Sequence, residues 1–408
     1  MLGSDFKALG LIRSLARRGI PSAVVDALPR SAWFSKHVRK RLRWRTEMWN
    51  PALVDFLLGV ASDHRLQGWV LIPVQDDAVE LVARHAARLS GAYRLVTPDW
   101  HVLRWAHEKH LLYEVAQKFG ISHPRTWYPV DESDLRNLSI EYPAVIKPSV
   151  SIQLQYATGQ KALVARDGRE LIAQYRRAAA VDSGTLMVQE VIPGDGRAQY
   201  SVATYWKDGG PIVAMTARRT RQFPADYGLS SSFVEAIETP ELMEPTRKLL
   251  EGLRLSGMIE VEFKLDSRDG RYKLLDVNVR PWAWHTLCIA CGIDFAYIQY
   301  CDALGQTLPA ASVRYGPCWR RFITDVPAAL QEIRSGTTTP WAYLRSLITS
   351  RAVPSVFDFR DPVPALGDIA LALWRLSGRP GQAEPSPSHG RSEASVEQLA
   401  RRPADDAR

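Results

Sequence analysis

Cysteine is scarce in this sequence of 408 residues, and long apolar runs are absent. The four cysteines are too few for a disulfide framework in a chain of this length: Cys288, Cys291, Cys301 and Cys318. No stretch approaches the roughly 18–20 uninterrupted apolar residues that a membrane span needs. Residues 1–5 show no basic region followed by an apolar core, so we expect no signal peptide. These absences predict a reduced, cytoplasmic protein without a membrane span.

The composition excludes a disordered, collagenous or fibrous chain, because 46% of the residues are hydrophobic and 24% are charged. The formal net charge is +8, and residues 36–45 form a basic cluster, Lys-His-Val-Arg-Lys-Arg-Leu-Arg-Trp-Arg. We interpret this cluster as a solvated basic face beside an early strand. Contact with nucleic acid or with an anionic membrane surface is the alternative. No zinc-finger spacing or RNA-binding signature is present, so no nucleic-acid partner is expected.

The first hundred residues alternate helix and strand patterns, which predicts a parallel sheet covered by helices on both faces. The expected helices are 9–18, 51–63 and 77–90, and the expected strands are 21–26, 69–73 and 93–97. A Rossmann-like unit should open with a strand, whereas here Leu2-Gly3 is followed almost at once by the first helix. Either the first strand is absent or the true start lies upstream.

Two antiparallel strand pairs are expected further along the chain, after a helix over residues 107–119. Their strands span residues 201–205, 212–219, 258–265 and 271–279. Beyond Gly305 the pattern becomes helical and proline-broken. The last thirty residues are rich in proline, glycine and serine, which predicts a disordered tail.

The second strand pair carries the most informative polar residues. Its first strand contains Glu260 and Glu262, and its second contains Asp276 and Asn278. Residues two apart in a strand share a face, so all four polar side chains are expected to point the same way. Two carboxylates and an amide oxygen on one face are hard ligands of the kind that suits magnesium bridged by phosphates. An exposed hairpin with a solvated polar face is the alternative interpretation.

The expected register of this pair follows from its turn. If the turn is centred on Arg268, Glu262 lies opposite Leu274 and Glu260 lies opposite Asp276. Glu260 therefore competes with Glu262 as a metal ligand, and parity along the strand does not choose between them. A one-residue bulge would move both glutamates off the face together.

Cations suited to nucleotide phosphates accompany this pair. Lys147 ends a short strand where a loop begins, and Lys109 is in the first turn of a helix. Arg219 and Arg221 are expected to share one face of a strand, and Arg280 follows the acidic pair. Each of these residues alone is more often a surface residue, but together with the carboxylates they indicate a functional site.

The order and spacing of short motifs resemble those of the ATP-grasp superfamily, in its carboxylate–amine ligase branch. The resemblance runs from about Leu2 to Gly305. Each motif alone is weak, and the assignment rests on their order. The matching motifs are Glu108-Lys109, Phe119-Gly120-Ile121-Ser122-His123-Pro124, Pro143-Ala144-Val145-Ile146-Lys147-Pro148, Gly159-Gln160-Lys161-Ala162, Val188-Gln189-Glu190-Val191-Ile192-Pro193-Gly194, Arg219-Thr220-Arg221-Gln222-Phe223-Pro224, Val261-Glu262-Phe263 and Leu275-Asp276-Val277-Asn278-Val279-Arg280-Pro281.

The resemblance implies an α/β fold with four regions. These are a Rossmann-like pre-ATP-grasp domain (1–98), an ATP-grasp domain of two α+β subdomains (99–305), a helical C-terminal extension (306–378) and a disordered tail (379–408). The nucleotide would lie between the two subdomains, with a hinge near residues 189–192.

The resemblance also assigns roles to individual residues. It implies nucleotide binding by Lys109, Lys147, Gln189, Glu190 and Ile192, with the lysines on the phosphates and the backbone of the hinge strand on adenine. It implies metal binding by Glu262, Asp276 and Asn278. It implies catalytic roles for Arg219, Arg221 and Arg280, with Arg280 facing the phosphoryl or acyl group.

The implied cofactors are ATP and Mg²⁺, the latter expected as two ions that Mn²⁺ can replace. The implied substrates are a small-molecule carboxylate and an amine, whose identities the sequence does not reveal. The carboxylate would attack the γ-phosphate of ATP, and the amine would then displace phosphate from the acyl phosphate to form an amide or peptide bond. A homodimer is the default expectation for such ligases.

Departures from the family pattern support a second hypothesis. The phosphate-covering loop is usually rich in glycine and small residues, whereas residues 149–158 read Ser-Val-Ser-Ile-Gln-Leu-Gln-Tyr-Ala-Thr. The alternative function is a catalytically weak or inactive ATP-binding regulatory protein of the same fold. In addition, Asp276 replaces a common glutamate. Either Asp195 or Gln199 substitutes for the usual ribose-binding acid, or that contact is absent. A bicarbonate-activating carboxylase is a third hypothesis, but no biotin-carrier signature supports it.

Other noticeable residues have ordinary structural interpretations. The cluster Trp282, Trp284 and His285 is expected to pack in the core, and a role in an acceptor pocket is the alternative. Cys288 and Cys291 form a Cys-x-x-Cys pair without a second pair, so we expect a core position rather than zinc or redox chemistry. The three serines at 230–232 have two possible interpretations: they contact a substrate carboxylate, or they form a solvated turn.

Overall fold

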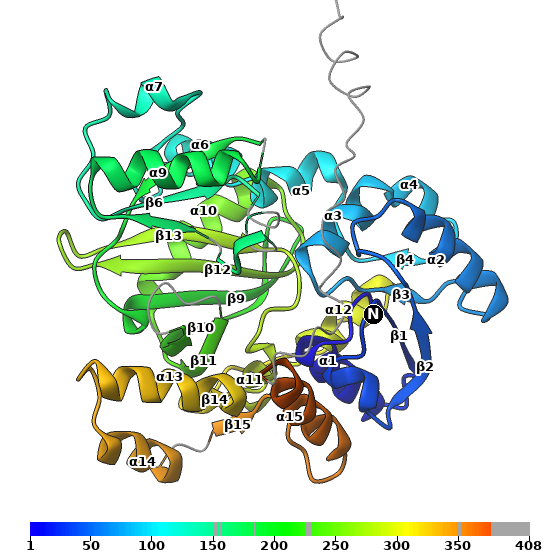
Figure 1. Ribbon diagram of the computed structural model, residues 1–408. Helices are drawn as coiled ribbons and strands as arrows, with labels where there is room; N and C mark the ends of the chain where they lie inside the picture. Colours follow the sequence, from blue (N-terminus) through cyan, green and yellow to red (C-terminus); the bar gives the residue numbers. More distant parts are fainter. Residues whose placement is uncertain are drawn as a thin grey trace, which may run out of the picture.

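The computed structural model describes residues 1–150, 154, 157–160, 162–182, 184–224, 230–349 and 352–376. The expected tail and half of the loop 149–158 lie outside the described residues. The chain forms a mixed α/β structure in which an N-terminal lobe lies beside two further sheets (Figure 1). No helix in these described ranges is long and apolar enough to cross a membrane.

The N-terminal lobe is built on short parallel strands. β1 (Ser22–Asp26) pairs with β2 (Val38–Arg43), and β3 (Val70–Leu71) pairs with β4 (Arg94–Leu95). The buried Leu2 joins the two pairs, because its backbone bridges Val25 and Pro73 in parallel. The expected first strand is therefore present, but reduced to the residues around Leu2. The helical segments of this lobe are α1 (Phe6–Ala16), η1 (Ser31–Phe34), α2 (Ala52–Asp63), α3 (Asp76–Arg84) and α4 (Ala86–Leu89).

The smaller of the two further sheets has four antiparallel strands in the order β5-β8-β6-β7. Its strands are β5 (Thr126–Trp127), β6 (Ala144–Pro148), β7 (Leu163–Ala165) and β8 (Leu186–Glu190). The helices α5 (Trp100–His107) and α6 (Lys109–Lys118) precede it, so the helix expected over residues 107–119 begins at Lys109. One face of the sheet is covered by α9 (Gly168–Ala179), with the short α7 (Glu132–Leu135) beside α9 (Figure 1).

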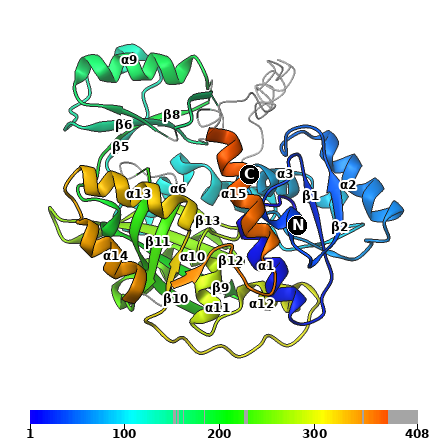
Figure 2. The same ribbon diagram turned by 60° about the horizontal axis from the view of Figure 1, so that its bottom comes forward.

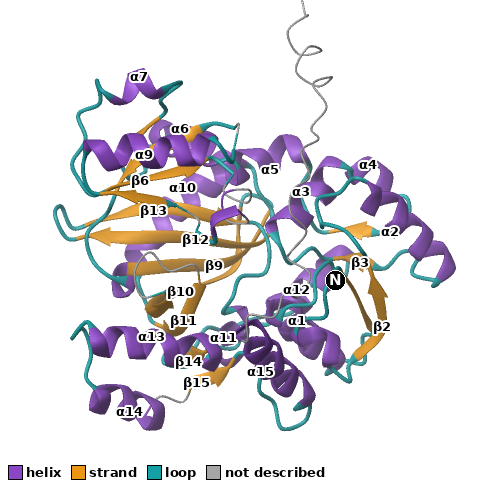
Figure 3. Ribbon diagram, viewed as in Figure 1, coloured by secondary structure: helices purple, strands orange, loops and turns teal. Residues whose placement is uncertain are grey.

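The larger sheet has seven strands in the order β13-β12-β9-β10-β11-β14-β15 (Figure 3). Its central strands contribute apolar residues to both faces: Val202 belongs to the core cluster that contains α10 residues, and Ala203 belongs to the cluster that contains α11 and α12 residues. The strands are β9 (Gln199–Lys207), β10 (Gly210–Phe223), β11 (Ser230–Ala236), β12 (Gly257–Asp266), β13 (Arg271–Asn278), β14 (Cys318–Arg320) and β15 (Ala352–Pro354). The associated helical segments are η2 (Gly196–Ala198), η3 (Pro240–Leu242), α10 (Met243–Leu253), α11 (His285–Ala290) and α12 (Phe295–Ala303).

The region after Gly305 was expected to be helical, and it also supplies two strands. β14 pairs antiparallel with β11, and β15 pairs in parallel with β14, so both extend the large sheet. The helices of this region are α13 (Phe322–Arg334), α14 (Pro340–Thr349) and α15 (Val363–Leu376). All three helices lie at the bottom of Figure 1, the side that is turned forward in Figure 2.

The register of the acidic hairpin, β12–β13, differs from the expected one. Glu260 lies opposite Asn278, and Glu262 lies opposite Asp276. The pairing next to the turn, taken alone, would put Glu262 opposite Leu275 and direct Asp276 to the other face. A bulge at Leu275 shifts the pairing by one residue and restores the parity. The four polar side chains share one face as expected, but with different partners.

Candidate active site

Asn278 connects the two glutamates on the polar face of the hairpin. Its Nδ2 donates hydrogen bonds to Glu260 Oε2 and to Glu262 Oε1, both at 3.1 Å. Because this amide donates through nitrogen, its oxygen is left as an acceptor suited to a hard cation. Among the described residues, no group of three or more His, Cys, Asp or Glu side chains is arranged to hold a metal ion. A cation here would therefore use carboxylates together with this amide oxygen and with oxygens that the protein does not supply.

The two glutamates differ in their surroundings. Glu260 is 3% exposed, and its Oε1 accepts a hydrogen bond from Trp284 Nε1 at 2.8 Å. Burial, followed by the negative charge of Glu262, raises the pKa of Glu260 to about 8. The Glu262 side chain is 22% exposed. Glu262 is therefore accessible to a ligand. Glu260 is buried in the core, and its ionised form is disfavoured beside the charge of Glu262.

Two lysines face the acidic hairpin from other elements. Lys109, the first residue of α6, places Nζ 2.6 Å from Asp276 Oδ1. Burial lowers the pKa of Lys109, but the ion pair with Asp276 outweighs burial and raises it overall. The side chain of Lys147, in β6 of the small sheet, makes no hydrogen bond or ion pair with a described residue. Burial and the charge of Lys109 lower the pKa of Lys147 to about 7, so this position strongly favours an anionic partner.

The segment after β8, where the resemblance implies a hinge, has backbone groups free of the sheet. Gln189 is 3% exposed, and its Nε2 donates to Thr126 Oγ1 at 2.8 Å. β8 ends at Glu190, and the buried Ile192 lies just beyond it. Of the two candidates for a ribose contact, Asp195 is paired with the neighbouring Arg197, whereas Gln199 Oε1 is buried with no partner in the described part of the chain.

Glu190 belongs to an ion-pair network that joins the two sheets. Its carboxylate accepts from the backbone N–H of Arg125 at 2.8 Å and from Arg268 Nη2 at 2.9 Å. Lys273 lies within 3.7 Å of the same group. Glu190 is 4% exposed and its pKa is held below the ordinary value despite burial, because these cations and N–H groups surround it. The ion pairs of Glu190 therefore stabilise the end of β8 against the large sheet.

Arg219 and Arg280 lie close to the acidic face. An Nη atom of Arg219 is 3.5 Å from Glu262 Oε2. Arg280, two residues after β13, donates through Nε and Nη2 to both carboxylate oxygens of Asp76, which begins α3 of the N-terminal lobe. The Nη2–Oδ2 distance is 2.9 Å, and the Arg280 side chain is 13% exposed. This bidentate pair fixes one guanidinium between the N-terminal lobe and the large sheet.

Arg221 is separated from this group. β10 is irregular between Arg219 and Gln222, so the two arginines do not continue a regular alternation. Arg221 is 5% exposed, and its Nε lies 2.8 Å from Oδ1 of Asp325 in α13. Oδ2 of the same fully buried carboxylate lies 3.2 Å from Arg320 Nε. The structure therefore brings Arg219 and Arg280 to the acidic face and directs Arg221 into a buried ion cluster.

Replacing Asp325 with alanine is expected to lower the free energy of unfolding by about 3–5 kcal/mol, because two buried guanidinium groups would lose their shared counter-charge. Urea unfolding measures the change. Glu244→Ala is the matched control: it breaks an exposed pair with Arg247 and should cost less than about 1 kcal/mol. Equal, small effects of both variants would contradict the assigned structural role of the Arg221–Asp325 pair.

Sequence reasoning missed the contributions of the N-terminal lobe and the core contacts of the hairpin. Asp76 is 204 residues from Arg280, and no motif around it indicated the contact. The only available signal was its place at the start of a helix that follows a predicted strand. Trp282 and Trp284 are buried as expected, and Trp284 also holds Glu260.

Burial tests two further sequence expectations. Cys288 and Cys291 are fully buried, which confirms their core position, and burial raises the pKa of both thiols. Ser231 and Ser232 are buried in β11, so the interpretation of residues 230–232 as a solvated turn is wrong. A strand pairing with β10 on one side and β14 on the other accounts for this burial.

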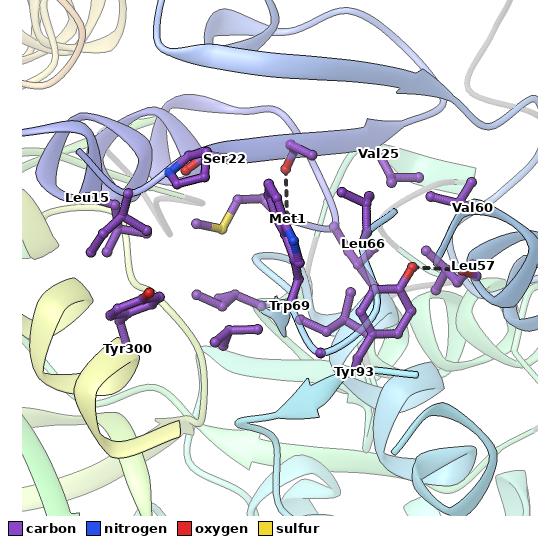
Figure 4. A pocket seen from close by; sticks show the side chains of 18 of the residues that line it. Met1, Leu15, Ser22, Val25, Leu57, Val60, Leu66, Trp69, Tyr93 and Tyr300 are labelled. Carbon is purple, nitrogen blue, oxygen red and sulfur yellow. Dashed lines mark hydrogen bonds between the residues drawn. The ribbon is translucent and has the colours of Figure 1, made fainter. Parts of the chain in front are cut away.

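An apolar cavity of about 230 Å³ lies in the N-terminal lobe, apart from the acidic hairpin (Figure 4). Met1, Leu15, Trp69 and Tyr300 are among the residues that line it. Figure 4 also shows the α-amino group of Met1 donating to the carbonyl of Ala23, at 2.9 Å. None of the described residues that line the cavity is a lysine, an arginine or an acid. The cavity therefore offers no side chains suited to nucleotide phosphates or to a metal ion.

Comparison with known proteins agrees with this geometry. A family model described as "ATP-grasp in the biosynthetic pathway with Ter operon" matches residues 182–317, which include the acidic hairpin. The D-aspartate ligase of Enterococcus faecium (strain Aus0004) is 24% identical over 297 residues, which cover 69% of this chain and 70% of that protein.

Solved structures share the fold. L-amino acid ligase from Bacillus licheniformis superimposes with a TM-score of 0.61 at 15% identity, covering 78% of this chain and 77% of that one. The ADP complex of N5-carboxyaminoimidazole ribonucleotide synthetase gives 0.61 at 13% identity, with 82% and 84% covered. Biotin carboxylase from Campylobacter jejuni gives 0.61 at 14% identity, with 77% and 72% covered. The chain therefore has the ATP-grasp fold, and its residues 182–317 match an ATP-grasp family model.

Proposed function

We propose that this protein is an ATP-dependent carboxylate–amine ligase that forms an amide or peptide bond through an acyl phosphate and releases ADP and phosphate. The proposal rests on one observation: acidic side chains and lysine side chains from different elements face one another. A face of carboxylates and an amide on β12–β13 is met by Lys109 and by Lys147, whose ammonium group has no partner among the described residues. The names of the similar ligases support the same reaction class.

Glu262, Asp276 and Asn278 are the proposed magnesium ligands, and two ions are expected. Their oxygens are hard donors on one strand face, and Glu262 and Asp276 keep accessible side chains. Bound magnesium would neutralise charge on the transferred phosphoryl group. Mn²⁺ is expected to substitute, because it accepts the same carboxylate and carbonyl ligands.

Lys109 and Lys147 are the proposed partners of the nucleotide phosphates. In the structure Lys109 pairs with Asp276. A metal ion bound to Asp276 would replace this pairing, so the ammonium group of Lys109 would be available to phosphate. The backbone of residues 189–192 is the proposed adenine contact, because β8 leaves the sheet there with Gln189 and Ile192 buried. Glu190 would then keep the hinge in place through its ion pairs rather than bind adenine with its side chain.

The affinity for ATP is expected to fall as pH rises above about 7. Phosphate binds the protonated form of Lys147 and raises its pKa, so below the free pKa of about 7 the affinity is fully present. Above that pH the free protein must first take up a proton, and the affinity falls by up to tenfold per pH unit. Calorimetric titration with ADP and magnesium between pH 6 and 9 tests this. The Lys147→Arg variant, whose side chain stays charged, should bind with little pH dependence.

Arg280 and Arg219 are the proposed catalytic cations. Arg280 is held by Asp76 beside the acidic face, where charge develops on the phosphoryl and acyl oxygens during transfer. Arg219 adjoins Glu262 and adds a second positive charge. In the first step an oxygen of the substrate carboxylate forms a bond to the γ-phosphorus as the bond to ADP breaks. In the second step the amine nitrogen bonds to the acyl carbon as phosphate leaves.

The proposed acid is an amino acid or a close analogue, as in the similar D-aspartate and L-amino acid ligases. Purified protein with ATP and magnesium is incubated with a panel of D- and L-amino acids and amines. ADP and phosphate should appear only when both an acid and an amine are present. AMP and pyrophosphate as products would exclude the acyl-phosphate route.

A regulatory, non-catalytic protein is the second candidate function, and the bulky composition of residues 149–158 favours it. Small residues let backbone N–H groups approach phosphates closely, and this segment has few of them. Tight binding of ATP and magnesium without turnover across the same panel would support this alternative.

A further inference from the structure

The C-terminal helices leave an unusual number of apolar side chains exposed. Thirteen of the nineteen exposed large hydrophobic side chains in the described ranges lie between Phe322 and Trp374. Eleven of the thirteen form one row on each helix: Phe322, Val326 and Leu330 on α13, Trp341, Leu344 and Ile348 on α14, and Val363, Leu366, Ile369, Leu373 and Trp374 on α15. Exposed apolar surface gathered in this way indicates a binding face rather than an ordinary solvated surface.

Helix α15 is firmly docked on its inner side. A Cβ on Gly367 would lie 2.5 Å from Cδ2 of Phe34, so α15 packs closely on η1. Asp368 Oδ1 accepts a hydrogen bond from Ser31 Oγ at 2.7 Å. The outer side carries Leu366 at 66% exposure and Leu373 at 62%. We call the exposed residues of α15, from Val363 to Trp374, the outer face of α15.

A row of arginines lies on the neighbouring strand. In β2 the buried Val38 and Leu42 alternate with Arg39, Arg41 and Arg43, which are all exposed. We call these three arginines the basic row. In the described part of the chain, none of them forms an ion pair with an acidic side chain. The basic cluster noted in the sequence therefore presents uncompensated positive charge.

The basic row and α15 are connected through η1. Arg41 donates to the carbonyl oxygens of Trp33 at 2.6 Å and of Ser35 at 2.7 Å, at the two ends of the segment whose Phe34 packs against Gly367. Figure 2 shows α15 beside the lobe that contains β1 and β2. The apolar and basic surfaces are thus neighbours in the folded chain.

The exposed charged side chains of the C-terminal region are all positive in the described ranges. These side chains are Arg314, Arg334, Arg345 and Arg360. Three acids are buried in ion pairs, Asp325 with Arg221, Glu332 with Arg197, and Asp361 with Arg13. The other two acids of the described region, Asp358 and Asp368, are half-buried. The outward surface therefore combines apolar side chains with positive charge, and it lacks exposed acids among the described residues.

We propose that the outer face of α15 and the basic row bind an anionic membrane surface. A helix that presents an apolar stripe beside basic residues can lie in the membrane interface, with its apolar side chains among the acyl chains and the cations on lipid headgroups. Trp374, an exposed residue of the outer face of α15, belongs to the residue type that favours this interface. The helices lie on the membrane in this proposal and do not cross it.

Charge disfavours one other occupant, and composition disfavours a second. A symmetric dimer through this face would bury the basic rows of both copies without supplying acidic partners, which is costly. The segment that follows α15, residues 377–408, contains only Val396 and Leu399 as large aliphatic residues and no aromatic residue. It has too little apolar surface to cover the rows of three helices.

Sedimentation with lipid vesicles tests the proposal on the full chain. The protein should sediment with vesicles of phosphatidylcholine and phosphatidylglycerol, much less with phosphatidylcholine alone, and less at high salt. Leu366→Glu with Leu373→Glu should lower the partition coefficient by about tenfold or more. Arg39→Gln with Arg43→Gln should lower it by about tenfold and weaken its salt dependence. The matched control Ile212→Glu changes an exposed apolar residue of β10 outside this face, and it should have no effect.

Three results would overturn the proposal. The first is no sedimentation of the unaltered protein with phosphatidylglycerol vesicles. The second is a dimer in light scattering that Leu366→Glu dissociates, which would assign the face to a second copy. The third is binding to an acidic protein without binding to vesicles. None of these readouts depends on ATP turnover, so they are independent of the proposed ligase activity.

Discussion

Replacing Asp276 with asparagine is expected to lower kcat for ATP turnover by about a thousandfold or more, because the site loses one of its two charged metal ligands. The protein should remain folded. The Asp276 side chain is 36% exposed, and losing its ion pair with Lys109 should change the free energy of unfolding by about 1 kcal/mol or less. Steady-state release of ADP at saturating ATP and magnesium measures the first effect, and urea unfolding measures the second. Asp269→Asn, an exposed carboxylate in the β12–β13 turn, is the matched control.

Glu262→Gln and Glu260→Gln separate the two candidate ligands on β12. Glu262→Gln should cause a loss comparable to that of Asp276→Asn and raise the magnesium concentration required. It should also lower the pKa of Glu260, because the neighbouring negative charge is removed. Glu260→Gln should have the smaller effect, since Glu260 is buried against Trp284. If Glu260→Gln alone destroys activity, the ligand assignment is wrong.

Replacing Arg280 with methionine is expected to lower kcat by about 10²–10³-fold while the affinity for ATP changes little. The guanidinium lies beside the acidic face, where charge accumulates on the transferred phosphoryl group and the acyl oxygen only during reaction. Single-turnover rates and calorimetric titration with ADP separate the two quantities. Arg280→Lys should recover only part of the rate, because lysine cannot reproduce the bidentate contact with Asp76.

Asp76→Asn tests how the contact from the N-terminal lobe acts. This variant keeps the positive charge of Arg280 but removes the carboxylate that orients it, so the rate should fall less than in Arg280→Met. An Arg280→Met variant that keeps its rate and loses affinity for ATP would place this guanidinium on the nucleotide rather than on the reacting groups.

The polar face of the hairpin was predictable from sequence, but its register was not. The alternation of Glu260, Glu262, Asp276 and Asn278 depends only on the period of a strand. The partners depend on the turn and on the bulge at Leu275, which the alternation of residues along the strand does not reveal. The pairing next to the turn is shifted by one residue from the expected register, and the bulge shifts it by one more. A total shift of two residues keeps the four polar side chains on one face, although each expected pair was wrong.

The N-terminal lobe was recognisable because its helices and strands alternate, while its first strand was hidden. Leu2 performs the role of that strand with a single bridged residue on each side, and so short an element has no detectable period. The strands β14 and β15 were missed for the same reason, since each has three residues.

Charged residues were harder to assign than apolar ones. The sequence pattern placed Arg219, Arg221 and Glu190 in one group of candidates, but their partners are distant along the chain. Arg221 pairs with a carboxylate 104 residues away, and Glu190 pairs with a guanidinium 78 residues away. Whether a charge serves structure or chemistry depends on such partners, which tertiary contacts determine.

Transfer of isotope from the acid to phosphate tests the central claim most directly. An acid that supports turnover is labelled with ¹⁸O in its carboxylate and incubated with the protein, ATP, magnesium and hydroxylamine as the amine. If the carboxylate is activated as an acyl phosphate, ADP forms, a hydroxamate accumulates, and one ¹⁸O atom appears in the released phosphate. Label appearing in AMP, or unlabelled phosphate formed together with the hydroxamate, would contradict the account.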